Sequence, residues 1–264
     1  MDINNPQDLS PLLNAAVDIA RGAGKIHLQY FRRPDLRIDN KLNDSDIVTT
    51  ADKEAEKYII TEINRRFPTH SILSEESGAS GTDEKSPKWI IDPLDGTTNF
   101  SQGLPLFCVS IGIMHGDKDL VGVVYNPYLD ELFHAVRGQG AWLNGKPINC
   151  SGKTELSKAV VATGFPVDKG SNSDNNIDNV ARVTPAVRGL RRLGSAAIDL
   201  AYVGAGFLDA YWEMNLHEWD VAAGRLIATE AGASYTLWRD SSTRGICALA
   251  GTPGIFPLIF EKLI

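Results

Sequence analysis

The spacing of apolar residues changes twice along this chain, and each change marks a different kind of structure. Over Leu9–Tyr30, and again over Ala51–Ile63, apolar residues recur at steps of three and four. Those steps give the period of an amphipathic helix. Phe67-Pro68 closes the second segment, because proline disfavours helical geometry in the residue before it. The first part of the chain therefore predicts two helices.

From Ser71 to Ile148 the pattern becomes one of short β-branched and aromatic runs. Turn residues such as Gly116-Asp117 and Asn144-Gly145 separate these runs, as in an antiparallel meander. The predicted strands cover residues 89–91, 108–113, 120–125 and 131–136. We expect residues 1–150 to form one α+β subdomain, in which the two helices pack on this sheet.

After Ser151 strands and helices alternate, which predicts a second, α/β subdomain over residues 151–264. Its strands are expected at 159–163, 208–213 and 246–250, and its helices at 195–206, 219–231 and the C-terminal end. The polar stretch Asp168–Asp178 predicts a loop. The fold class is therefore mixed α/β.

Composition limits the possible function classes. The 264 residues are 43% hydrophobic, enough for one large core or two packed subdomains. A net charge of −7 and scattered basic residues give no support to nucleic-acid binding. No apolar stretch of about 18 residues and no signal-peptide pattern occur, so neither membrane spanning nor secretion is expected. Cys108, Cys150 and Cys247 lie far apart, and we expect reduced thiols in a cytoplasmic protein.

The segment from Trp89 to Phe100 carries the strongest chemical signal. An apolar strand runs directly into Asp92-Pro93-Leu94-Asp95-Gly96-Thr97-Thr98. We expect Asp92 at the strand end and Asp95 across a tight turn, so that both carboxylates and the Leu94 carbonyl can bind hard cations. Gly96 lets the backbone approach an anion. If Thr97 and Thr98 open a short helix, their N–H groups point at a phosphate.

An ordinary turn explains the five residues from Asp92 to Gly96 equally well, because Asp, Pro and Gly are common turn formers. Two further acidic segments weaken that interpretation. Ser74-Glu75-Glu76-Ser77 ends an apolar run, and Glu218-Trp219-Asp220 opens a predicted helix. Strand ends and helix starts are the positions where sites on α/β sheets usually lie.

Together these segments resemble the inositol monophosphatase family of metal-dependent phosphatases. The likeness extends over nearly the whole chain, and its specific motifs are Asp46 through Asp52, Ser74 through Ser77, Trp89 through Phe100, and Glu213 through Gly224. The resemblance implies a layered α-β-α-β-α sandwich of the type shared with fructose-1,6-bisphosphatase. It also implies a homodimer, with the site where the two halves of the chain meet.

The resemblance further implies the metal ligands. A first magnesium would be bound by Glu75, Asp92 and the Leu94 carbonyl, a second by Asp92, Asp95 and Asp220, and a weaker third would lie near Glu75. Such ions act as Lewis acids on phosphoryl oxygens and lower the pKa of a bound water. Lithium would inhibit by occupying the second position after turnover.

Thr97, Asp52 and Glu75 are the implied catalytic residues. Thr97 would orient the attacking water, and Asp52 would accept a hydrogen bond from the Thr97 hydroxyl. An acid at position 52 also suits the first turn of a helix with no catalytic role. Lys41 matches a family lysine near the metal-site loop, although a lone lysine is more often merely solvated.

The implied substrate-binding residues are Gly96, Thr97, Thr98, Ser195, Ala196, Glu213 and Asp220. Glu213 would accept hydrogen bonds from substrate hydroxyls, which suits a polyol. The same pocket would be lined by Ser195, Ala196 and the segment Gly164-Phe165-Pro166. A purely structural role explains them equally well, as a helix cap at 195–196 and a loop at 164–166. The chain departs from the usual family pattern with Ser74 in place of glycine and Gln102 in place of histidine, and neither is an implied ligand.

The implied function is Mg²⁺-dependent hydrolysis of myo-inositol 1-phosphate, or of a related sugar or polyol phosphate, to the alcohol and orthophosphate. Relatives with the same metal core act on fructose-1,6-bisphosphate, L-galactose 1-phosphate, histidinol phosphate or 3′-phosphoadenosine 5′-phosphate, and the sequence separates these substrates poorly. A regulatory protein that keeps the fold and binds a partner is an alternative of another class. That alternative predicts eroded ligands, whereas every expected ligand is present.

Overall fold

The computed structural model describes residues 6–40, 47–81, 86–239 and 245–263. Lys41 and Asp46, which the sequence analysis singled out, lie outside these residues. Within the described ranges, we find no helix with the length and apolar character needed to cross a membrane.

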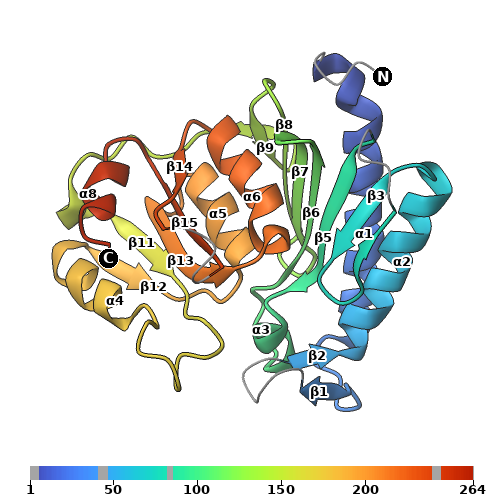
Figure 1. Cartoon of the computed structure of the whole chain (residues 1–264), viewed down its shortest axis with the longest axis horizontal. Coiled ribbons are helices and arrows are strands. Elements are labelled where there is room, and N and C mark those ends of the chain that lie inside the picture. The colour runs from blue at the N-terminus through green and yellow to red at the C-terminus, as the bar shows by residue number, and fades with distance from the viewer. Residues whose placement is uncertain (1–5, 41–46, 82–85, 240–244, 264) are drawn as a thin grey trace.

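The chain folds into the expected alternation of helical and sheet layers (Figure 1). The first layer holds α1 (Ser10–Tyr30) and α2 (Thr50–Arg66), and the middle layer holds α5 (Ala196–Gly204) and α6 (Glu218–Glu230). The last layer holds α4 (Ile177–Val183) and α8 (Phe256–Phe260). Short 3₁₀ turns occur at η1 (Pro6–Leu9), η2 (Leu156–Lys158) and η3 (Thr184–Ala186).

An eight-stranded sheet in the order β10-β9-β8-β7-β6-β5-β3-β4 separates the first and middle layers. Its strands are β3 (Ser71–Ser74), β4 (Gly78–Ser80), β5 (Lys88–Asp95), β6 (Cys108–His115), β7 (Lys118–Asn126), β8 (Glu131–Val136), β9 (Ala141–Leu143) and β10 (Lys146–Ile148). Ile19 of α1 and Ile59 of α2 share a fully buried core with Trp89 of β5. The predicted meander and the two helices packed on it are therefore confirmed.

A five-stranded sheet in the order β12-β11-β13-β15-β14 separates the middle and last layers. Its strands are β11 (Val160–Thr163), β12 (Gly189–Arg191), β13 (Ala210–Leu216), β14 (Ser234–Leu237) and β15 (Ile246–Gly251). A separate hairpin of β1 (Ile38–Asn40) and β2 (Ile47–Thr49) leads into α2. The large sheet ends at Ile148 and the small one begins at Val160. A division into two subdomains at residue 150 stays a prediction.

Local structure differs from the expectation at two places. Strand β5 does not end at Asp92 but continues to Asp95, and its register against β6 shifts by one residue between them. A β-bulge thus replaces the predicted tight turn, and a bulge tolerates Pro93 because its extra residue makes no ladder bond. The predicted loop at 168–178 is also shorter, because α4 begins at Ile177.

A pair of glycines allows α6 to lie directly on the large sheet. Gly112 of β6 and Gly122 of β7 are register partners. A Cβ atom at Gly112 would lie 2.7 Å from the Cβ of Ala222, and one at Gly122 would lie 2.5 Å from the carbonyl oxygen of Ala223. Both neighbours belong to α6, so this contact sets the height of the helix above the sheet, and with it the position of Asp220 in the first helical turn.

Gly122→Ala is therefore expected to lower the free energy of unfolding by about 1–3 kcal/mol, because the added methyl must displace helix backbone. Urea denaturation measures the change. Gly152→Ala is the matched control, since a Cβ there meets nothing within 4 Å. The control should change stability by no more than about 0.5 kcal/mol. Equal losses in the two variants would contradict the close packing of α6.

Candidate active site

The pairing of β3 with β5 brings the first two predicted ligands, Glu75 and Asp92, close together. These strands run parallel, and Ser74 pairs with Ile91. The Glu75 N–H donates to the Ile91 carbonyl oxygen at 3.2 Å, which extends the pairing by one residue. Glu75 and Asp92 each come directly after one residue of the Ser74–Ile91 pair, so they lie side by side on neighbouring chain segments.

Asp92 and Asp95 are buried and are each held through one carboxylate oxygen. The Leu94 N–H donates to Asp92 Oδ1 at 2.9 Å. The Ser195 hydroxyl and the Ala197 N–H each donate to Asp95 Oδ2 at 2.7 Å. The start of α5 thus anchors Asp95 across the junction between the two halves of the chain. In the described part of the protein these bonds leave the second oxygen of each carboxylate available to a ligand.

Asp220 lies in the first turn of α6, where its Oδ2 accepts a hydrogen bond from the His217 N–H at 2.6 Å. The ring of His217 stacks on Trp219, with centroids 4.6 Å apart. His217 is thus the residue that caps the helix carrying Asp220. The negative charge of Asp220 contributes to the raised pKa of both Asp92 and Asp95, so the three carboxyl groups belong to one cluster.

The cluster is electrostatically unfavourable on its own. Burial, together with the charge of Asp220, raises the pKa of Asp95 to about 7, although hydrogen bonds from Ser195 and Ala197 oppose the shift. Burial, followed by the charges of Glu75, Asp95 and Asp220, raises the pKa of Asp92 well above its ordinary value. No lysine or arginine among the described residues forms an ion pair with Asp92 or Asp95.

This donor set suits a hard divalent cation. Carboxylate and carbonyl oxygens are the ligands that Mg²⁺ prefers, and a cation relieves the repulsion between buried carboxylates. Among the residues that the structure describes, no three His, Cys, Asp or Glu side chains already form a cage for an ion.

The hydroxyl of Thr97 lies between two oxygens, 3.0 Å from Asp52 Oδ1 and 3.0 Å from the Leu94 carbonyl. Asp52 also accepts hydrogen bonds from the N–H and hydroxyl of Thr49, at 2.8 and 2.5 Å, as the capping box of α2. Burial raises the pKa of Asp52 to about 6, against the lowering effect of these bonds. Asp52 therefore both caps the helix and contacts Thr97.

Gly96 joins the end of β5 to the short helix α3 (Thr97–Ser101), in a left-handed conformation with φ 92°. A Cβ atom there would lie 2.9 Å from the Leu106 carbonyl oxygen. Asn99 fixes the same turn by donating to the carbonyls of Leu106 and Leu193, both at 2.7 Å. Helix α3 begins at Thr97, as predicted, and Thr98 in its first turn is exposed.

The predicted substrate residues of the second half lie on α5 and β13. Ser195 caps α5 and also holds Asp95, with the buried Ala196 directly after it. Glu213 on β13 accepts a hydrogen bond from the Tyr211 hydroxyl at 2.7 Å. Its carboxylate packs on Gly164, where a Cβ would lie 2.0 Å from the carboxylate oxygens. Burial raises the pKa of Glu213 to about 8.

Two buried acids were missed by the sequence analysis. Asp199 is 1% exposed, and its Oδ1 has no hydrogen-bond partner in the described part of the chain. Burial and the charge of Glu213 raise its pKa well above the usual range. Glu56 is buried on α2 and accepts hydrogen bonds from Ser74 and Ser77. An acid inside the otherwise apolar α5, and an acid one turn after Asp52, were the available signals.

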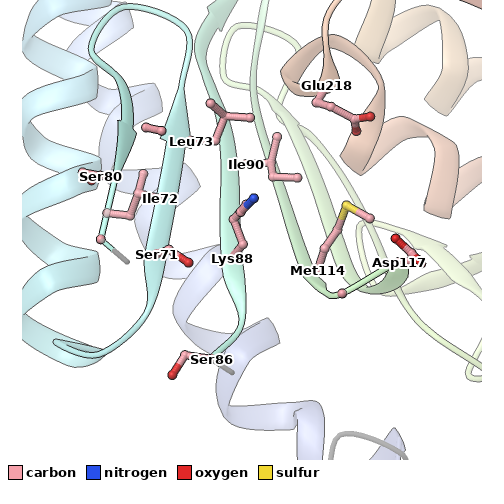
Figure 2. Close-up of a pocket in the computed structure, with 13 residues that line it drawn as sticks. Ser71, Ile72, Leu73, Ser80, Ser86, Lys88, Ile90, Met114, Asp117 and Glu218 are labelled. Carbon is pink, nitrogen blue, oxygen red and sulfur yellow. The ribbon is translucent and has the colours of Figure 1, made fainter. Parts of the chain in front are cut away.

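A cavity of about 770 Å³ lies next to this region but does not include it. Leu73, Ile90 and Met114 line it from β3, β5 and β6, and Glu218 lines it from α6 (Figure 2). None of the residues predicted to bind metal or substrate lines it. We therefore place the candidate site at the acidic cluster. Gln102, the second departure from the family pattern, is exposed at the end of α3.

Comparison with known proteins identifies the family. A family model described as "Inositol monophosphatase family" matches residues 8–258. The chain is 43% identical over 251 residues to "Inositol-1-monophosphatase" of Synechocystis sp., which covers 94% of this chain and 87% of that protein. It is 43% identical over 224 residues to "Nus factor SuhB" of Escherichia coli K12, covering 85% and 84%. The structure of inositol monophosphatase from Anabaena (Nostoc) sp. matches with a TM-score of 0.85 at 38% identity, covering 97% and 96%. The chain therefore belongs to the inositol monophosphatase family.

Proposed function

We propose that this protein is a magnesium-dependent phosphomonoesterase that hydrolyses myo-inositol 1-phosphate, or a related polyol phosphate, to the alcohol and orthophosphate. Membership of the family supports phosphatase activity. The observation that carries the proposal is the pair of buried carboxylates Asp92 and Asp95 close to the charge of Asp220, with no lysine or arginine partner for Asp92 or Asp95 among the described residues. A cytoplasmic location and a homodimer, both expected from the sequence, are part of the proposal.

Glu75, Asp92 and the Leu94 carbonyl would hold one magnesium, and Asp92, Asp95 and Asp220 a second, with a weaker third near Glu75. Bound magnesium supplies Lewis acidity to the phosphoryl oxygens and lowers the pKa of the attacking water. The protein's own contribution is to keep several carboxylates in place without neutralising them. Hydrogen bonds from Leu94, Ser195 and Ala197 do this by fixing one oxygen of Asp92 and of Asp95.

Thr97 and Asp52 would orient the attacking water. When the Thr97 hydroxyl donates to Asp52, its lone pairs are left to accept a proton from that water. The proton can then pass to Thr97 as the Thr97 proton passes to Asp52. With a pKa raised to about 6, Asp52 can hold a proton close to neutral pH.

Glu213 would select for a hydroxylated leaving group. It is anchored by Tyr211, and Gly164 leaves no side chain between the carboxylate and the neighbouring backbone. With a pKa of about 8, the carboxyl group can accept or donate a hydrogen bond to a substrate hydroxyl near neutral pH. Gly96, Thr98, Ser195 and Ala196 would line the phosphate side of the same pocket.

A second candidate function is regulation through a protein partner. It is favoured by one finding, namely that several relatives at 42–44% identity are named "Nus factor SuhB". The two functions can coexist on one fold, because a fold does not dictate a single function. A protein that bound partners but released no phosphate from any substrate would favour this second function alone.

Purified protein with millimolar Mg²⁺ should release orthophosphate fastest from myo-inositol 1-phosphate or another polyol phosphate. The comparison panel holds fructose-1,6-bisphosphate, L-galactose 1-phosphate, histidinol phosphate and 3′-phosphoadenosine 5′-phosphate. Lithium should inhibit the reaction, as the family resemblance implies. Turnover chiefly of the nucleotide would overturn the substrate class, and no turnover of any member would overturn the enzymatic function.

Asp95→Asn and Asp220→Asn should each lower kcat by a factor on the order of 10² or more, as expected for loss of one preorganised electrostatic contact. Steady-state phosphate release at saturating magnesium measures the change. The exposed acid Asp178 on α4 provides a matched control. Asp178→Asn makes the same substitution at a residue that is not a proposed ligand. Near-normal rates in either ligand variant would contradict the assignment.

Magnesium should raise the melting temperature more at pH 8 than at pH 5. The pKa of Asp95 rises from 3.8 to about 7 on folding, so between these values the folded protein holds a proton that the unfolded chain releases. This group therefore stabilises the metal-free protein in acid and loses that contribution as the pH rises through 7. Above pH 7 magnesium no longer competes with the proton.

Asp95→Asn should reduce this difference between the two pH values, and the raised pKa of Asp92 should account for the part that remains. Thermal unfolding followed by circular dichroism, with and without magnesium, measures both proteins. An identical magnesium effect at pH 5 and pH 8 in the unsubstituted protein would count against Asp95 as a ligand.

A further inference from the structure

We propose that Glu56 and Ser74 are positioning residues for Glu75, joined in a latch between α2 and the turn that follows β3. We use "Glu56 latch" for the hydrogen bonds of Glu56 with Ser74 and Ser77. The inference rests on the proposed function, in which Glu75 binds metal. No role for Glu56 follows from the sequence motifs, and Ser74 stood out there only as a departure from the family pattern.

The latch concentrates three hydrogen bonds on one carboxylate oxygen. Glu56 Oε1 accepts from the Ser74 hydroxyl at 2.5 Å, from the Ser77 N–H at 3.0 Å and from the Ser77 hydroxyl at 3.1 Å. Glu56 is 8% exposed and Ser74 is fully buried. Hydrogen bonds to a charged acceptor in such surroundings are stronger than bonds between neutral groups. The turn is therefore tied firmly to α2.

The tied turn contains Glu75, which lies between the two serines. On its other side, Glu75 is held by its N–H bond to the Ile91 carbonyl of β5, the residue just before Asp92. The turn also closes the β3–β4 hairpin, in which Ser74 pairs with Gly78. Glu75 thus has its backbone fixed from the sheet and from the helix at once, which restricts where its carboxylate can reach.

Glu56 follows Asp52 by one helical turn, so the two acids lie on the same face of α2. Asp52 holds Thr97 and Glu56 holds the turn of Glu75. Acids spaced i and i+4 destabilise a helix by mutual repulsion. Asp52 offsets this by serving as the capping box of α2, whereas the bonds of Glu56 run to the turn after β3, so the burial of Glu56 is explained if it fixes that turn.

Ser74 gives the latch a feature that depends on this chain. The resemblance noted in the sequence implies glycine at this position, and glycine has no side chain to donate. The serine hydroxyl adds a third hydrogen bond, and a short one, to those from Ser77. Replacement by the usual residue should therefore loosen the turn without removing any proposed metal ligand.

Three variants test the latch through the affinity for Mg²⁺, measured by isothermal titration calorimetry and as the concentration that half-saturates phosphate release. Residues that support metal ligands commonly change metal affinity by about 10–100-fold when replaced. Glu56→Ala should weaken magnesium binding by about tenfold or more, and Ser74→Gly by a few-fold. Glu56→Gln should restore most of the affinity, because its amide oxygen can still accept these hydrogen bonds.

The matched control is Glu54→Ala, which removes an exposed acid from the same helix. It should leave the magnesium affinity unchanged. Amide hydrogen exchange supplies a metal-free readout, in which Glu56→Ala should speed exchange at Ser77 by about tenfold or more, because the Ser77 N–H loses its acceptor.

A Glu56→Ala protein that melts at a lower temperature but keeps the magnesium affinity of the unsubstituted protein would overturn the latch, since the role of Glu56 would then be structural only. Unchanged affinity in Ser74→Gly would overturn the part assigned to Ser74. If the unsubstituted protein binds magnesium but releases no phosphate, the proposed function fails while calorimetry still decides the latch. If it binds no magnesium, both proposals are overturned.

Discussion

Repulsion between buried carboxylates is the constraint on which the rest of the site depends. Asp92 and Asp95 lie on one bulged strand, and the charge of Asp220 reaches them from the start of a helix in the other half of the chain. Such a group is unfavourable for folding and persists only because packing imposes it. The glycine pair beneath α6 and the helix start that anchors Asp95 act on this cluster, and the two acids of α2 fix Thr97 and the turn of Glu75 beside it.

The arrangement separates the holding of the site from its chemistry. Each buried aspartate of β5 uses one oxygen for backbone or hydroxyl donors, and Asp52 and Glu56 bind loops through serine, threonine and main-chain groups. Oxygens that would face a ligand are therefore oriented by strands and helices, which gives more precise sites than flexible loops do. A relative that is 43% identical to this chain is named a Nus factor, and a fold by itself does not dictate a single function.

Much of this fold could be predicted from the sequence, because periodicity reports which face of an element is buried. The helices at 10–30 and 50–66, the meander and the α/β alternation were all predicted in this way. The path of β5 was not, because Asp-Pro-Leu-Asp-Gly is composed of turn formers, and only pairing with β6 reveals the bulge. Helix α4 was missed because Asn176, just before it, bonds to Thr163 and Gly164 in another part of the chain. Glu56 and Asp199 were missed because burial of an acid is a property of tertiary packing.

Diffraction from crystals soaked with Mn²⁺ and phosphate, with anomalous data that locate the manganese, tests the central claim most directly. We expect manganese bound by carboxylate oxygens of Asp92, Asp95 and Asp220 together, with further density beside Glu75 and the Leu94 carbonyl and a phosphate oxygen on the metal. Manganese that binds only elsewhere on the protein, with these carboxylates left apart, would contradict the claim.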